Sequence, residues 1–201
     1  MLITKKMVLE FWEYMQGKYG FSVINKNDSS MMKMVDWILS GIGIMDRKEF
    51  LNNYSTTVGH SVYIPFVLGE GDSLGLMDQV IICAHEAQHV VQYNKDNAIF
   101  VGGYVSSKSR RASYEVEAYN VTMEMYYYFT GKVLSSNFLC NLLSKYAIDE
   151  VDLSVSRKRF DIQRKVLRLG IITSDVSVDA IQWWQKREQE TGISTVVDLR
   201  S

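Results

Sequence analysis

Two histidines with a glutamate between them form the pattern in this chain that most clearly indicates chemistry. His85, Glu86 and His89 occur within the segment 80–92, VIICAHEAQHVVQ. On a helix, residues four apart project from one face a turn apart, so the two imidazoles could bind one zinc ion. Glu86 is rotated out of that row but stays beside it, where a carboxylate can take a proton from a zinc-bound water. The pattern therefore predicts a zinc site with Glu86 as its general base.

The apolar residues around this pattern favour a metal site over histidines that only fill the core. The chain has three histidines, and two of them fall in the pattern. The runs at 80–82 and 90–91 are aliphatic and would bury the helix beneath the site. A solvent-facing helix with incidental histidines does not need such apolar surroundings.

The stretch 85–89, HEAQH, resembles the HExxH signature of zincin metallopeptidases. A zincin needs a third protein ligand and keeps a fourth position for water. In the metzincin branch the signature continues as HExxHxxGxxH, but Gln92 and Lys95 stand where that glycine and that histidine would be. The resemblance is therefore to the gluzincins, which take a glutamate from a later helix.

The third ligand is expected in the segment 114–120, YEVEAYN, which resembles the ExxA motif of gluzincin-like families. These families include ImmA/IrrE-like peptidases and predicted metallopeptidases of bacteria and phages. Aligning on Ala118 makes Glu115 the ligand, although Tyr119 follows where such families often carry Asp or Asn. Glu117 is the alternate ligand; it lies about 200° around the helix from Glu115, so only one of them can face the metal. A charged, solvated helix face is the alternative for both.

The resemblance implies a zinc-dependent metallopeptidase with one zinc ion per chain. Zinc would polarise the scissile carbonyl, while Glu86 would pass a proton from the zinc-bound water to the leaving amine. His60 and Tyr119, together with Tyr104 and Tyr114, are candidates for stabilising the transition state, with ordinary structural roles as the alternative.

Partners of the histidine ligands should also exist, and Asn120 and Asp78 are the candidates. The expected partner of the protein is a peptide or protein substrate. The same residues could also hydrolyse a non-peptide amide.

A second hypothesis is a non-catalytic protein that keeps a zincin fold as a structural or binding component of a larger assembly, such as a phage particle. A scaffold would have no need of Glu86, so its presence favours catalysis. A protein assembly partner stays open under this hypothesis.

The residue patterns along the rest of the chain, which must position these side chains, predict an α+β, predominantly helical fold with a zincin-like core. We expect one domain over 1–201, with a helical N-terminal part (1–55), the metal-site core (56–130) and a helical C-terminal part (131–201). Apolar spacing, capping residues and terminal glycines predict the following helices. They are one from Thr4 to Gly17 or Gly20, then 31–39, 46–53, one from Leu76 or Asp78 to Gln92, and 109–129. Two or three more follow from Leu134, the last from Ser174 or Asp175 to near Gly192. Gly102 and Gly103 are expected in a loop between the two site helices, and Trp183 and Trp184 in the core.

A small sheet is expected from the segment 56–68, which is rich in β-branched and aromatic residues. Pro65 within it predicts an edge strand, because proline cannot donate to a central ladder. Such an edge could pair with an extended peptide at the cleft.

Charge and composition exclude some partners. The formal net charge is −1, and the short basic run of Lys108, Arg110 and Arg111 is expected to be a solvated face. Nucleic acid and membrane are therefore not expected as partners. Cys83 and Cys140 are expected as buried thiols. No signal peptide or long apolar stretch is seen, which predicts a cytoplasmic protein, with association with a virion left open.

Overall fold

The computed structural model describes residues 3–26 and 53–192. The helix expected over 31–39, and all but the last residue of the one expected over 46–53, lie outside these residues. The described part is mostly helical with a small sheet, as expected. Its helices are α1 (Lys5–Tyr19), α4 (Ser73–Asp96), α5 (Ala98–Ser106), α6 (Lys108–Thr130), α7 (Ser136–Ser144), α8 (Glu150–Arg168) and α9 (Asp175–Thr191). Its strands are β1 (Ser22–Asn25), β2 (Thr56–Val58) and β3 (Ser61–Ile64).

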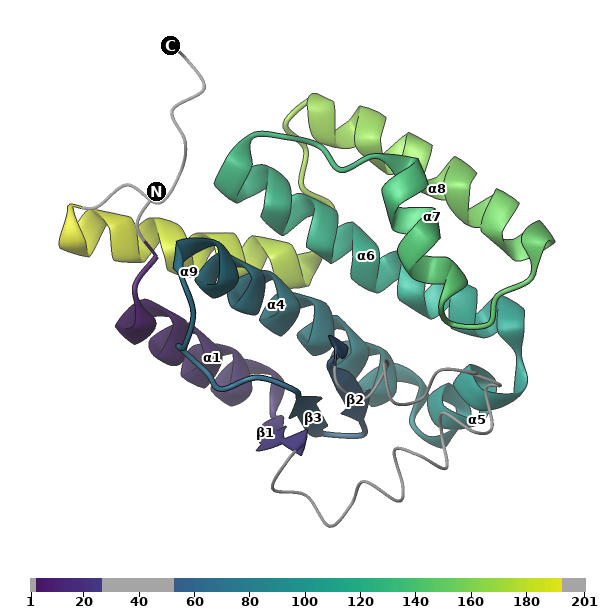
Figure 1. Ribbon diagram of the computed structural model, residues 1–201, viewed down its shortest axis with the longest axis horizontal. Coiled ribbons are helices and arrows are strands. Elements are labelled where there is room, and N and C mark those ends of the chain that lie inside the picture. The colour runs from purple at the N-terminus through teal and green to yellow at the C-terminus, as the bar shows by residue number, and fades with distance from the viewer. Residues whose placement is uncertain (1–2, 27–52, 193–201) are drawn as a thin grey trace.

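Helix α4 runs through the middle of the molecule and contacts most of the other elements (Figure 1). Its most extensive contact is with α6, and α1 and α9 pack against it as well. Helices α7 and α8 lie against α6, on the side away from α1 (Figure 1). The two helices with the candidate site motifs are therefore the central pair of the fold.

Local capping accounts for the helix ends that the sequence predicted. The Thr4 hydroxyl accepts a hydrogen bond from the Met7 amide at the start of α1. Gly20, Gly131 and Gly192 follow α1, α6 and α9 with φ values of 71°, 65° and 66°, a left-handed conformation that glycine adopts without strain. These predictions are confirmed.

The single edge strand expected over 56–68 is wrong. A turn at Gly59, whose φ is 61°, divides the segment into the antiparallel strands β2 and β3. Strand β3 also pairs in parallel with β1, so the strand order is β1-β3-β2 and β3 is central. Pro65 follows the last residue of β3 and so costs the ladder nothing. The sequence did not indicate β1, because four residues are too few to show a strand period.

The loop expected at Gly102 and Gly103 is also wrong, because both residues lie within α5. A Cβ on Gly103 would come within 2.8 Å of Arg110 Cδ. This glycine therefore allows α5 to pack closely against α6, which is a tertiary requirement rather than a turn signal.

Two apolar clusters hold the elements together. One joins α1, α4 and α9, and in it Trp184 is fully buried with its ring 5.5 Å from that of Phe11 and 5.4 Å from that of Phe129. The other joins α6, α7 and α8 around Phe160. The core position expected for Trp184 is confirmed, and Trp183 packs against the same cluster.

The remaining sequence expectations concern thiols and membranes. Cys83 and Cys140 are both buried free thiols, as expected. Within residues 3–26 and 53–192, no helix is both long and apolar enough to cross a bilayer.

Candidate metal centre

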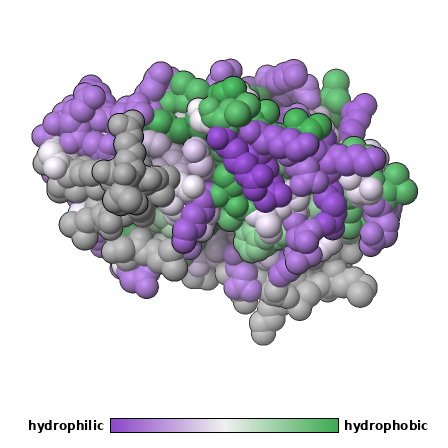
Figure 2. All heavy atoms as spheres, turned by 90° about the horizontal axis from the view of Figure 1, so that it is seen from above, coloured by the Kyte–Doolittle hydropathy of each residue, from purple (hydrophilic) through white to green (hydrophobic). Residues whose placement is uncertain are grey.

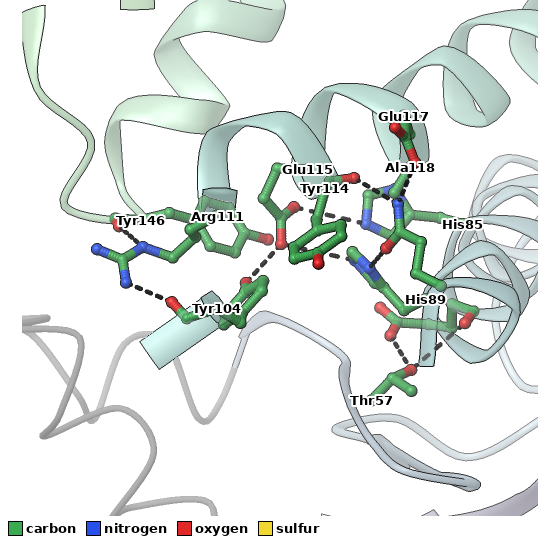
Figure 3. A network of polar contacts seen from close by, with 12 residues as sticks. Thr57, His85, His89, Tyr104, Arg111, Tyr114, Glu115, Glu117, Ala118 and Tyr146 are labelled. Carbon is green, nitrogen blue, oxygen red and sulfur yellow. Dashed lines mark hydrogen bonds and ion pairs between the residues drawn. The ribbon is translucent and has the colours of Figure 1, made fainter. Parts of the chain in front are cut away.

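Helices α4 and α6 bring together His85, His89 and Glu115. One ligand atom from each lies within 4.8 Å of the other two. Glu115 Oε1 is 3.5 Å from His89 Nε2, and Glu115 Oε2 is 3.9 Å from His85 Nε2 (Figure 3). All three side chains are buried, Glu115 with only 1% of its surface exposed. This cluster could hold a metal ion.

A side-chain amide determines which nitrogen of His89 faces the cluster. Gln92 Nε2 donates to the Tyr114 carbonyl and to Glu117 Oε2, both at 2.9 Å. Its Oε1 therefore faces His89 Nδ1, 2.8 Å away, and accepts that proton. The lone pair of His89 Nε2 is left to point towards Glu115, as a metal ligand requires.

Thr122 does the same for His85. Its hydroxyl donates to the Ala118 carbonyl at 3.3 Å and lies 2.9 Å from His85 Nδ1, from which it accepts. Burial, followed by the neighbouring His89, lowers the pKa of His85, which favours the neutral imidazole that binds metals. Both histidines therefore present Nε2 to the cluster.

These two partners of the histidines were not predicted from the sequence. Asn120 and Asp78, the expected candidates, hydrogen-bond neither ring among the described residues. Gln92 is three residues after His89 and Thr122 is seven after Glu115, so each shares a helix face with a ligand. Helical spacing from the predicted ligands would have identified both.

The structure brings Glu115, and not Glu117, to the two histidines. Glu117 lies beyond Gln92 and accepts its amide hydrogen bond. It therefore belongs to the chain of groups that orients His89, and the alternate ligand is not placed at the cluster (Figure 3).

The carboxyl group of Glu115 has one unsatisfied oxygen. The Tyr104 hydroxyl donates to Oε1 at 2.5 Å, whereas Oε2 is buried and has no hydrogen-bond partner in the described part of the chain. Burial raises the pKa of Glu115 to about 8, although Tyr104 and Arg111 act against this. A buried acceptor facing two imidazole lone pairs is costly unless a cation is shared between them. The residues present therefore fit a metal ion.

Glu86 lies beside the cluster, one residue after His85, and is also buried. The Thr57 hydroxyl donates to Glu86 Oε2 at 2.6 Å (Figure 3). Burial raises the pKa of Glu86, while His89, Thr57 and Lys26 oppose the shift. Strand β2 thus determines the orientation of this carboxyl group.

Lys26 was not predicted from the sequence, yet it is buried and its charge acts on Glu86. Its ammonium group donates to the Tyr54 carbonyl and to the Thr56 hydroxyl. Burial lowers the pKa of Lys26 to about 8, and Glu86 partly offsets that shift. A cation that follows β1 therefore acts on the carboxyl group held by β2.

The structure brings only some of the expected transition-state stabilisers to the site. The ring of Tyr119 is 5.0 Å from that of His85, and its hydroxyl is hydrogen-bonded to that of Tyr146. His60 lies in the turn between β2 and β3, where its Nε2 is 2.6 Å from Asn94 Oδ1, and it lines neither cavity at the cluster. Tyr114 donates to Asp96 instead.

The solvated position predicted for Arg111 is wrong, because only 1% of this residue is exposed. Its guanidinium donates to the carbonyls of Tyr146 at 2.8 Å and Tyr104 at 2.7 Å, and also to those of Val105 and Ala147 (Figure 3). It therefore joins the end of α5 to the loop between α7 and α8, which carry the two tyrosines near Glu115.

Two cavities formed by the described residues adjoin the cluster. The first has a volume of about 50 Å³ and a largely apolar wall from α5. The second has a volume of about 420 Å³ and extends along α4. The first is lined by Ser55, Thr56, Thr57, Val58, His85, Glu86, His89, Phe100, Val101, Tyr104, Val105, Glu115 and Tyr146. Ser55, His85, Glu86 and Tyr146 line both.

Comparisons of the chain with protein-family models, with curated proteins and with solved structures found no match. The chemistry of the site therefore carries the functional argument.

Proposed function

We propose that the protein is a zinc-dependent metallopeptidase with a zincin-like core. His85, His89 and Glu115 would hold the zinc ion, and Glu86 would act as general base. The observation that carries the proposal is the convergence of two imidazole lone pairs and an unsatisfied carboxylate oxygen within 4.8 Å, beside a second buried carboxyl group. Two nitrogens and one oxygen from three residues are a donor set that catalytic zinc sites use.

Zinc bound at these residues would supply a Lewis acid for the substrate carbonyl and lower the pKa of water. Glu86 accepts the proton of the attacking water and returns it to the leaving amine. Its raised pKa suits both steps, because a base that is too acidic would not take the proton. Thr57 holds the carboxyl group towards the cavity throughout.

The tyrosines near the cluster have separate roles in this mechanism. Tyr104 donates to Glu115 and so positions a ligand. Tyr146 lines both cavities and its hydroxyl is hydrogen-bonded to that of Tyr119, so it is our candidate donor for the oxygen of a substrate carbonyl. Burial raises the pKa of Tyr146, which keeps that hydroxyl protonated.

The sheet supports a peptide as the substrate. Strand β2 is at the edge of the three described strands, and its residues line the first cavity. An extended peptide could pair with that edge, which would bring a backbone carbonyl past Glu86. The available edge is therefore β2 alone and not the whole segment 56–68.

Metal content tests the ligand set. We expect about one zinc ion per chain by mass spectrometry in protein purified without added metal, and its loss in His85→Ala and Glu115→Ala. His60→Ala is the matched control and should keep the metal, and Glu117→Ala should lower the metal content much less than Glu115→Ala does. A wild-type protein that takes up no zinc on reconstitution would contradict the proposal.

Hydrolysis of fluorescein-labelled casein tests the catalytic role of Glu86. Glu86→Gln should keep the metal and the fold but lower the rate at least about 100-fold, because the general base is lost. Equal rates in the two metal-loaded proteins would remove Glu86 from the mechanism.

A second candidate function, a component of a protein assembly, is favoured by the outer face of α8. Three aliphatic side chains on that face, Val151, Val155 and Ile162, are more than half exposed, as is Leu169 directly after the helix. Figure 2 looks at the molecule from the side of α8 and shows hydrophobic residues interrupting a hydrophilic surface. Such an apolar stripe is typical of a protein contact. If Glu86→Gln retains the activity of the protein in its source cell while Ile162→Asp loses that activity, the assembly function is favoured over the peptidase function.

A further inference from the structure

The second cavity at the cluster is a groove that follows one face of α4. Its floor carries Asp78, Ile81 and Ile82 and continues to His85 and Glu86. Their spacing, i, i+3, i+4, i+7 and i+8, is that of a single face of the helix. The groove therefore leads from the candidate reacting site towards the N-terminal half of α4.

The groove and the site are continuous. Ser55, His85, Glu86 and Tyr146 line both the groove and the smaller cavity beyond the cluster. The hydroxyl of Ser55 lies at this junction, buried and without a hydrogen-bond partner within the described ranges. A substrate segment in the groove would reach the catalytic groups directly and could satisfy that hydroxyl.

The far wall of the groove is apolar. Leu134, Phe138 and Leu142 line it from α7 and the residues before it, and Ile81 and Ile82 line it from α4. Phe138 is 49% exposed, which is unusual for so large an apolar side chain. Covering this surface with apolar side chains of a substrate would be favourable.

The charge in the groove is of one sign. Asp78 and Glu86 are acidic, and no lysine or arginine of the described residues lines it. Asp78 lies eight residues before Glu86, a rise of about 12 Å along the helix. An extended peptide advances about 3.3 Å per residue, so Asp78 faces a position roughly three or four residues from the bond beside Glu86.

We propose that this groove binds the part of a peptide substrate on one side of the scissile bond. It selects apolar residues next to that bond and a lysine or arginine three or four residues further out, opposite Asp78. This inference rests on the proposed peptidase function, and it specifies the class of substrate.

A cleavage profile tests the selection directly. The zinc-loaded protein is incubated with peptides from a proteome digested by an Asp/Glu-specific protease, and the new cleavage sites are read by mass spectrometry. We expect a basic residue to be enriched three or four positions from the cleaved bond, and Asp78→Lys to abolish that enrichment. Glu13→Lys, an equal change of charge at an exposed residue of α1, should leave the profile as it is.

A binding measurement separates the groove from catalysis. Two fluorescein-labelled octapeptides, Ala-Lys-Ala-Leu-Phe-Leu-Ala-Ala and the same peptide with Glu for Lys, are titrated against zinc-loaded Glu86→Gln by fluorescence anisotropy. The lysine peptide should bind more tightly, and Asp78→Lys should weaken its binding about tenfold, since an exposed attraction becomes a repulsion. Phe138→Ala should weaken both peptides, whereas Ile162→Ala on α8 should weaken neither.

The two assays fail in different ways. If the wild-type protein cleaves nothing but the lysine peptide binds in the groove, the peptidase function fails and the groove is retained as a binding site. If cleavage occurs with the same profile in Asp78→Lys and Phe138→Ala, the groove inference is overturned and the peptidase function stands. The inference would also be overturned if the two peptides bound equally tightly and neither Asp78→Lys nor Phe138→Ala weakened their binding.

Discussion

Glu115 and Glu124 are both buried on α6, but their surroundings differ. Glu124 accepts four hydrogen bonds, one from Gln163 Nε2, two from the amide and hydroxyl of Thr173, and one from the Ser174 amide. Among the described residues, Glu115 accepts one, from Tyr104, and its Oε2 faces His85 at 3.9 Å without a donor. The oxygens of Glu124 are thus occupied by donors, whereas Glu115 has an oxygen available to a ligand.

This difference in hydrogen bonding shows how the role of a buried acidic residue can be recognised. Glu124 joins α6 to the start of α9, where free backbone amides favour a carboxylate. Glu115 gains no comparable stabilisation from its neighbours, so its burial costs free energy that the fold alone does not recover. Unsatisfied hydrogen-bonding capacity, rather than burial, distinguishes the candidate ligand from the structural residue.

The largest effect on stability is expected from Glu124→Ala. Three residues would lose the acceptor for buried donors, which should lower the free energy of unfolding by about 3 kcal/mol. Urea denaturation of the metal-free protein measures this. Glu115→Ala is the matched variant and should cost less than about 1 kcal/mol, because a single hydrogen bond is lost. Equal losses of unfolding free energy in the two variants would contradict the distinction between Glu124 and Glu115.

The pH dependence of stability sharpens the comparison. Burial raises the pKa of Glu115 from 4.5 to about 8, so the folded metal-free protein keeps a proton that the unfolded chain releases. The stability from this proton is complete below about pH 4.5 and is lost as the pH rises through about 8. Metal-free wild type should therefore lose more stability between pH 5 and pH 8 than Glu115→Gln does. Urea denaturation at the two pH values measures this loss. An equal loss of stability in wild type and Glu115→Gln would contradict the prediction.

A smaller effect is expected from the groups that orient the histidines. Gln92→Ala and Thr122→Ala should each weaken zinc binding about 10- to 100-fold, since the tautomer and ring orientation are no longer held. Competition with a chelator measures the affinity. Gln163→Ala, which removes a partner of Glu124, should lower stability and leave zinc affinity unchanged. A loss of affinity in Gln163→Ala would mean that the two regions are coupled.

The smallest effect is expected at Thr57. Its hydrogen bond lowers the pKa of Glu86, so Thr57→Val should move the acidic limb of the rate profile to higher pH. Casein hydrolysis should fall a few-fold near pH 6 and change little near pH 8. Thr130→Val, at the far end of α6, should leave the profile in place. An unshifted limb in Thr57→Val would show that this hydroxyl does not tune the base.

Most of the fold could be predicted from the sequence, because helices follow from local periodicity and caps. The ends of α1, α6 and α9 are examples, since each depends on residues within a turn of it. The sheet could not be predicted in the same way. Whether β3 is central or at an edge depends on β1, a strand separated from it by 35 residues or more along the chain.

The sequence by itself determined the pair of histidines and the adjacent glutamate. His85, Glu86 and His89 lie within five residues, and helical geometry alone places both imidazoles on one face. The motif that contains Glu115 could also be found, since it is continuous in the sequence.

Only the tertiary structure decided which buried groups have their hydrogen bonds satisfied. Arg111 is close in sequence to two basic residues, yet it is buried because its acceptors come from α5 and from the loop after α7. Tyr146 reaches the site, and Glu124 is closed off by Thr173, through contacts between distant segments. The physical reason is that the free energy of a buried polar group depends on the partners that folding brings to it, and these partners are not its neighbours in the chain.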